Sequence, residues 1–139
     1  MSVLFTPKEI GRIKIINRFV RSATALGMSA NGVPGHDVVE AIRYLASGEV
    51  GLIVSGHCFI HPSGMAGPAM TGIHSDELIP HHARIVEAVH QAGSGSKIFA
   101  QINHAGRQTR ERVIGEKPWA PSVVKDMSTG VLPRKMNED

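Results

Sequence analysis

The sequence has a single cysteine among its 139 residues, so Cys58 has no partner for an internal disulfide. A lone cysteine suits a reducing compartment. The first ten residues carry Lys8 and Glu9 where a signal peptide would need an apolar core. No apolar run approaches the roughly 20 residues of a membrane span. We therefore expect a cytoplasmic protein with no membrane partner.

Aromatic side chains and excess charge are also scarce. Only 4% of the residues are aromatic, and 15 basic residues against 12 acidic ones give a net charge of +3. The basic residues between Arg107 and Lys117 cluster without interleaved aromatics, so the sequence argues against nucleic-acid binding. The 42% hydrophobic content predicts a globular domain rather than a disordered chain.

Apolar runs alternate along the chain with segments of helical periodicity. Short alternating segments around Pro7 and Gly11 predict an N-terminal β-hairpin. Asp37 is the predicted N-cap of a first helix, and Ser75 opens a second that ends before Gly93. The predicted elements are hairpin strands at 4–5 and 13–15, strand 19–24, helix 37–46, strand 50–54, helix 75–92 and strand 97–102.

Strand–helix alternation of this kind predicts a parallel sheet with right-handed crossovers. Three strands and two helices leave both sheet edges open. A barrel of eight such units needs about 250 residues. We therefore predict an α/β fold: an incomplete TIM (β/α)8 barrel comprising about the first three βα units, preceded by the hairpin.

Polar residues follow the third predicted strand in the segment 101–107. Gln101 offers amide donors and a carbonyl acceptor, His104 can take or give a proton, and Arg107 carries a fork of donors. Such groups beyond a buried strand hold ligands in α/β proteins. The alternative interpretation of Gln101 is a polar residue that only caps the strand.

Six segments, in this order, resemble the Old Yellow Enzyme family of NAD(P)H:flavin oxidoreductases, which are FMN-binding (β/α)8 barrels. They are LFTP at 4–7, NRFVRSAT at 17–24, GLI at 51–53, GIHSDE at 72–77, QINHAGR at 101–107 and APS at 120–122. The resemblance implies that residues 1–139 form the N-terminal portion of an FMN-binding TIM-barrel oxidoreductase domain.

The resemblance also implies a flavin site. In it, Gln101 pairs its amide with the pyrimidine edge of the isoalloxazine, since a glutamine presents a donor and an acceptor side by side. Ala25 departs from the residues that many members carry near a flavin carbonyl, and its methyl group cannot donate a hydrogen bond. The implied cofactor-binding residues are Ser22, Ala23, Thr24, Ala25, Gly56, His57 and Gln101.

The implied reaction passes a hydride from NADH or NADPH through FMN to a small electrophilic acceptor. The family's substrate-orienting histidine pair and phosphate-binding loops come from later strands, so the catalytic residues are unknown and we expect the chain alone to be inactive. The alternative is a non-catalytic half-barrel fragment that self-associates through its open edges, and either interpretation favours a homo-oligomer.

A metal site is not predicted. His57 and Cys58 are adjacent, so on a strand they point to opposite faces, and no third ligand stands at suitable spacing. Cys58 is predicted to be a small buried hydrophobe. The three histidines of the second helix form no i, i+4 pair and are predicted to be solvated; they are His81, His82 and His90.

Overall fold

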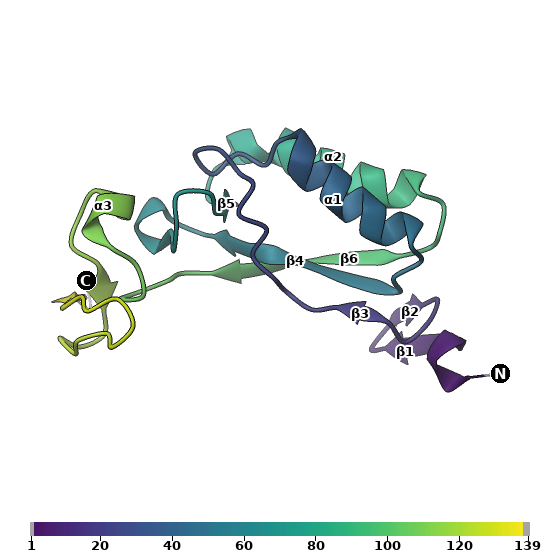
Figure 1. Cartoon of the computed structure of the whole chain (residues 1–139), viewed down its shortest axis with the longest axis horizontal. Coiled ribbons are helices and arrows are strands. Elements are labelled where there is room, and N and C mark those ends of the chain that lie inside the picture. The colour runs from purple at the N-terminus through teal and green to yellow at the C-terminus, as the bar shows by residue number, and fades with distance from the viewer. Residues whose placement is uncertain (1, 138–139) are drawn as a thin grey trace.

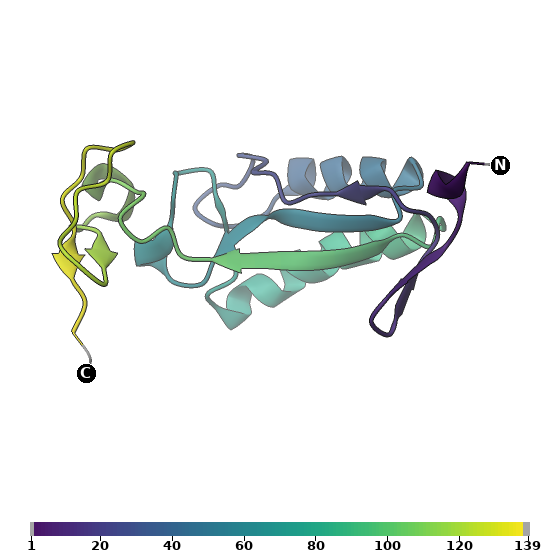
Figure 2. The ribbon, with the colours of Figure 1, turned by 90° about the horizontal axis from the view of Figure 1, so that it is seen from below.

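The computed structural model describes residues 2–137 and shows a parallel sheet covered on one face by two helices (Figure 1). Strand β4 (Leu52–Phe59) lies at the centre, with β3 (Val20–Arg21) on one side and β6 (Lys97–Asn103) on the other. Helices α1 (His36–Ser47) and α2 (Ile79–Gln91) lie side by side on the same face. Figure 2 views the opposite face, where no helix covers the strands. The predicted α/β class is confirmed.

The two helices begin and end close to the predicted positions. Asp37 is not the N-cap of α1: Gly35 occupies that position, and Asp37 lies in the first turn, where its charge favours the helix dipole. Ser75 caps the 3-10 turn η3 (Asp76–Leu78), which leads into α2. Gly93 follows α2 with a φ of 69°, as expected of a glycine that ends a helix.

Strand β4 is longer than predicted because it has a neighbour along its whole length. On one side, β3 pairs with the first two residues of β4, and β5 (Thr71–Gly72) pairs with its last two, Cys58 and Phe59. β6 pairs with the other side. After β3 the chain continues without strand pairing as far as Ser29, whose Oγ lies 2.7 Å from Thr71 Oγ1.

The core lies between the helices and the covered face of the sheet. Ile53 is fully buried at 0% exposure and packs against apolar side chains from both helices. These residues recur at helical spacing, so each helix presents one apolar stripe to the strands. The buried cluster consists of Val38, Ile42, Ala46, Ile53, Ile85 and Val89.

The N-terminal hairpin is confirmed with different bounds. Its strands are β1 (Lys8–Ile10) and β2 (Ile13–Ile15), which pair antiparallel. The prediction of a strand at 4–5 is wrong, because those residues lie in the 3-10 turn η1 (Val3–Phe5). The Phe5 ring packs edge-on against Phe19 at a centroid distance of 5.3 Å, which joins the hairpin to the start of β3.

The prediction that β6 is buried is wrong. Phe99 and Ile102 are 39% and 63% exposed. Their exposure has two causes: no strand pairs with the outer edge of β6 within residues 2–137, and no helix covers the face that Phe99 occupies. β6 is therefore an apolar edge strand.

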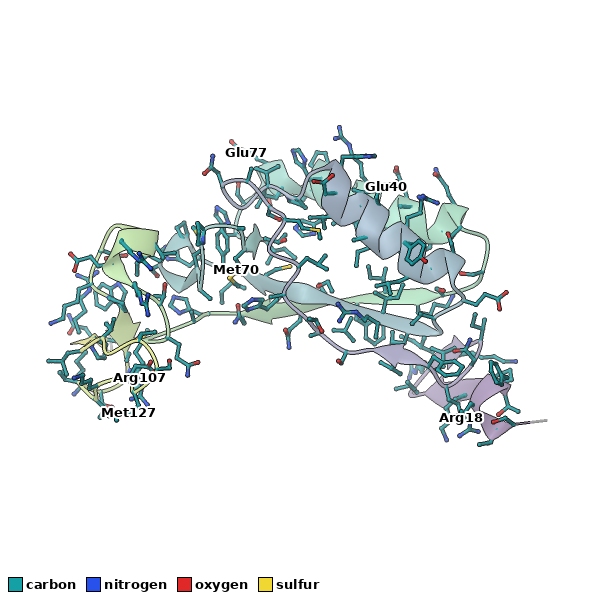
Figure 3. All side chains as sticks on the ribbon, viewed as in Figure 1. Arg18, Glu40, Met70, Glu77, Arg107 and Met127 are labelled. Carbon is teal, nitrogen blue, oxygen red and sulfur yellow. The ribbon has the colours of Figure 1, made fainter. Side chains whose placement is uncertain are left out.

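The residues after β6 form a C-terminal lobe, in which Figure 3 labels Arg107 and Met127. It contains the short helix α3 (Glu111–Ile114) and the parallel pair β7 (Trp119–Ala120) and β8 (Arg134–Lys135). The Arg134 guanidinium lies 3.3 Å from the Trp119 ring centroid and pairs with Glu116. None of the helices described between residues 2 and 137 has the length and apolar character to cross a bilayer.

Asp126 organises a turn in this lobe. Its Oδ1 accepts hydrogen bonds from the backbone and side chains of Ser128 and Thr129, at 2.6–3.0 Å. These bonds, the Ser128 hydroxyl foremost, lower the pKa of Asp126 to about 2. The carboxylate is also 3.8 Å from Arg107 Nε, measured to Oδ2.

We expect Asp126 to make the protein less stable in acid. Its pKa is lower in the folded chain than the usual 3.8, so its stabilising effect is present above 3.8 and is lost as pH falls toward 2. Asp126→Asn keeps Oδ1 as an acceptor but removes the charge. Thermal melts between pH 2 and pH 5 should therefore show a shallower pH dependence for the variant. Superimposable profiles would contradict this role.

Candidate functional site

A β-bulge lies where two predicted segments of the site, 56–57 on β4 and 101 on β6, meet. The register between β4 and β6 shifts between Val54 and His57, so that Ser55 and Gly56 both lie opposite Ala100. Ser55 Oγ accepts a hydrogen bond from the Gln101 backbone N–H at 3.2 Å, which satisfies a donor that the bulge displaces from the ladder. The bulge therefore links β4 to the residue that leads the polar segment of β6.

Glycine at position 56 allows the chain after β3 to approach β4. A Cβ there would lie 2.9 Å from the Thr24 carbonyl oxygen and 3.6 Å from Ala25 Cα. The first distance is too short for a side chain to be accommodated without displacing the backbone. Thr24 and Ala25 therefore pack on β4 at the level of the bulge, and Ser22 and Ala23 lead into them from the end of β3.

The predicted site residues lie within longer strands than expected. Gly56 and His57 are inside β4, and Gln101 is inside β6, where it pairs in register with His57. Gln101 and His57 share the face turned away from the helices, because alternate residues of a strand share a face and Ile98 belongs to the helix-covered one. The structure thus places Thr24 and Ala25 against Gly56, and His57 beside Gln101.

Gln101 has an unsatisfied side chain within the described residues. Its side chain is exposed, and its amide makes no hydrogen bond to any residue of the chain between 2 and 137. His57 is half-buried, and its Nδ1 lies 3.2 Å from Asn103 Nδ2. The uncovered face therefore presents an amide donor and acceptor next to an imidazole.

A cavity lies on the helix-covered side of the sheet. Its volume is about 460 Å³, and α1, α2 and the 66–71 loop supply most of its apolar lining. Ala25, Gly56 and His57 contribute to it, but Gln101 does not. A cavity with this mostly apolar lining provides few hydrogen-bonding groups for the polar edge of a ligand. The polar face of β4 and β6 is therefore the better candidate site.

The histidines and the cysteine considered as metal ligands have other surroundings in the described residues. No group of three histidine, cysteine or acidic side chains between residues 2 and 137 could hold an ion. His82, predicted to be solvated, instead lies with Nε2 2.8 Å from the Gly72 carbonyl oxygen. Cys58 is 2% exposed, as predicted, and its burial raises the pKa of the thiol, which disfavours the reactive thiolate.

A hydrogen-bonded network of two histidines and a serine beside the site could not be recognised from the sequence. Ser63, in the 3-10 turn η2 (Pro62–Gly64), lies with Oγ 2.8 Å from His61 Nδ1 and 3.1 Å from His104 Nε2. The Gly106 N–H donates to His104 Nδ1 at 3.0 Å, so neutral His104 carries its proton on Nε2. These hydrogen bonds join the loop after β4 to the loop after β6.

We expect acid to weaken this connection. Burial against the 63–64 turn, and secondly the charge of His61, lower the pKa of His104 below its usual 6.5. The contribution of neutral His104 to stability is therefore full above pH 6.5 and is lost as pH falls through the lowered pKa. His104→Gln cannot gain this proton. Its thermal midpoint should vary less between pH 5 and pH 7 than that of the parent chain, and an unchanged slope would contradict the assignment.

Comparison with known proteins decides the family. The sequence pattern of the NADH:flavin oxidoreductase / NADH oxidase family matches residues 3–138. The chain belongs to this family. FMN is the family's cofactor, and NADH or NADPH is its reductant.

Individual relatives agree with the family assignment. A metal reductase of Desulforamulus reducens is 36% identical over 139 residues, which is the whole of this chain and 20% of that protein. The NADPH dehydrogenase of Bacillus subtilis is 30% identical over 98% of this chain and 39% of its own length. The old yellow enzyme homologue of Zymomonas mobilis superimposes with a TM-score of 0.83 at 29% identity. That superposition covers 99% of this chain and 40% of the homologue, so the chain spans less than half of these relatives.

Proposed function

We propose that residues 2–137 are the hairpin and the first three βα units of an FMN-binding (β/α)8 barrel. The order of β3, α1, β4, α2 and β6, all parallel where they pair, supports this arrangement. The likeness to 40% of an old yellow enzyme homologue fits a partial barrel. In such a barrel the uncovered face of the sheet would turn toward the barrel interior.

The chain's contribution to the site would be one wall for FMN. Gln101 would pair with the pyrimidine edge, and His57 would lie next to it. The backbone of the segment Ser22–Ala25, held on Gly56, would line the ring. The observation that carries this proposal is the exposed Gln101 amide, which has no hydrogen-bond partner within residues 2–137 and lies beside His57 on the uncovered face. These residues fit the group, because they offer both a donor and an acceptor to a planar polar edge.

The parent protein would be an FMN-dependent NAD(P)H oxidoreductase. The chemistry that FMN supplies when bound is the acceptance of hydride from NAD(P)H and its delivery to a small electrophilic acceptor. The residues of this chain would bind and orient the ring and leave its outer face accessible. Because the family's phosphate-binding loops and substrate-orienting histidine pair come from later strands, the chain should bind FMN weakly and show no turnover by itself.

Fluorescence titration of FMN with the full chain tests the proposal. We expect weak, saturable quenching, and no yellow complex that survives gel filtration. Gln101→Leu removes the amide bonds and should raise the Kd about tenfold, since two net hydrogen bonds of roughly 0.5–1.5 kcal/mol are lost.

Gln108→Leu provides the matched control, because Gln108 is also exposed but lies in the C-terminal lobe. Its Kd should equal that of the parent chain. Equal affinities for the parent chain and Gln101→Leu would refute the flavin-facing role of Gln101. A stoichiometric yellow complex after gel filtration would refute the weak binding expected of the isolated chain.

A second function, assembly through the open sheet, is favoured by a specific observation. The outer edge of β6 has no strand partner within the part of the chain that the structure describes, and its apolar side chains are exposed. An exposed edge strand is a template for pairing with another chain. We propose that the isolated chain forms a homo-oligomer through this edge.

A further inference from the structure

The side-chain oxygen of Asn103 is a buried hydrogen-bond acceptor that no donor of the described residues contacts. Its Oδ1 has no hydrogen-bond partner within residues 2–137, although its Nδ2 is 3.2 Å from His57 Nδ1. A buried polar atom without a partner costs about 1–3 kcal/mol. Packing alone therefore gives a poor reason for an amide at this position.

The position of Asn103 relates it to the candidate site. It is two residues after Gln101 on β6, so both side chains lie on the same face of the strand. His57 pairs in register with Gln101, and Asn103 reaches it diagonally across the two strands. Asn103, His57 and Gln101 thus form one continuous polar group on the uncovered face.

The contact between Asn103 and His57 decides where the histidine holds its proton. In this structure the Asn103 amide turns its NH2 group toward His57; in that orientation Nδ1 accepts, and the neutral ring carries its hydrogen on Nε2. The Nδ1 side of the His57 ring is then held by Asn103, and Nε2–H lies on the opposite side of the ring. His57 therefore presents a hydrogen-bond donor and no acceptor to a ligand.

We propose that Asn103 is a positioning residue that holds His57 as an Nε2–H donor for a ligand carbonyl oxygen at this site. This inference rests on the proposed function, because it places that oxygen beside the group bound by Gln101. A carbonyl oxygen could belong to the flavin ring or to an unsaturated ketone acting as the electrophilic acceptor. The experiment below separates these two sources.

The first measurement is histidine side-chain ¹⁵N NMR of the full chain, with the His57 signals assigned from His57→Gln. We expect the Nε2–H form in the parent chain. Asn103→Asp should reverse it to Nδ1–H, because a carboxylate only accepts. The other seven histidines are internal controls whose signals should not change. A parent His57 protonated on Nδ1, or an unchanged form in Asn103→Asp with the fold intact by circular dichroism, would overturn the inference.

The second measurement adds FMN alone, or cyclohexenone alone, to the labelled chain. A shift of the His57 Nε2 resonance with one of them identifies the source of the oxygen. His57→Gln keeps an N–H donor and should bind that probe as the parent chain does. His57→Phe keeps a ring without a donor and should weaken binding about threefold or more, as expected for one hydrogen bond.

The outcomes separate this inference from the proposed function. If FMN shifts the Gln101 amide resonance but neither probe shifts the His57 resonance, His57 is not the donor, and the proposed contact of Gln101 with the flavin is retained. If neither Gln101 nor His57 responds to FMN, the flavin wall is wrong. Equal binding by His57→Phe and His57→Gln overturns the donor role in either case.

Discussion

Asn17→Ala is expected to lower the free energy of unfolding by about 2–4 kcal/mol, since three hydrogen bonds at a buried site lose their partner. Asn17 Oδ1 accepts from the Gly51 and Phe19 N–H groups at 3.0 and 3.1 Å. Its Nδ2 donates to the Glu49 carbonyl oxygen at 2.6 Å. One buried side chain therefore joins the entry of β3 to the turn between α1 and β4.

Urea unfolding followed by circular dichroism measures this effect. Asn137→Ala, at an exposed position, is the control and should change stability by less than about 0.5 kcal/mol. Gly51→Ala provides a second variant at the same junction, because its Cβ would lie 2.7 Å from the Asn17 carbonyl oxygen. It should also be destabilising. An Asn17→Ala chain as stable as the control would show that the junction contributes little.

Ile102→Lys is expected to weaken self-association of the isolated chain about tenfold or more. Ile102 is 63% exposed, against 39% for Phe99 on the same strand, so a lysine there costs the monomer little. A charge on an edge strand opposes pairing with a second chain, because it would have to be desolvated or neutralised on association. Light scattering over a concentration series gives the mass of the assembly.

Met127→Lys provides the matched control for this substitution. Met127 is 91% exposed and lies in the C-terminal lobe, away from the sheet edge (Figure 3). The same gain of charge there should leave the assembly unchanged. Equal loss in both variants would indicate a general charge effect, and a parent chain that stays monomeric at every concentration would contradict assembly through β6.

The sequence predicted the order of helices and strands because local signals mark them. Ser75 and Gly93 mark the bounds of α2, and apolar spacing identifies the buried stripe of α1. The burial of β6 was predicted wrongly, because an apolar run does not reveal whether a neighbouring strand or helix is there to cover it. The length of β4 was underestimated because Ser55 and Gly56 look like the end of a strand, whereas they form a bulge within it.

The candidate site was only partly accessible from the sequence. The resemblance named Gln101 and His57, and the strand register places them side by side. The resemblance gave no role to Asn103, because its contact with His57 depends on how β4 and β6 are aligned after the bulge. The link between Ser63 and His104 spans 41 positions and likewise requires the folded sheet.

Titration of the ¹⁵N-labelled full chain with FMN, followed by amide chemical shifts, shows which face of the sheet binds the flavin. We expect saturable shifts that are largest at the Gln101 side-chain amide, which does not line the apolar cavity, and that extend to His57 and Thr24–Ala25. Shifts that are largest at Val38 and Ile85, in the apolar cavity behind the sheet, would contradict this expectation, as would the absence of any saturable shift.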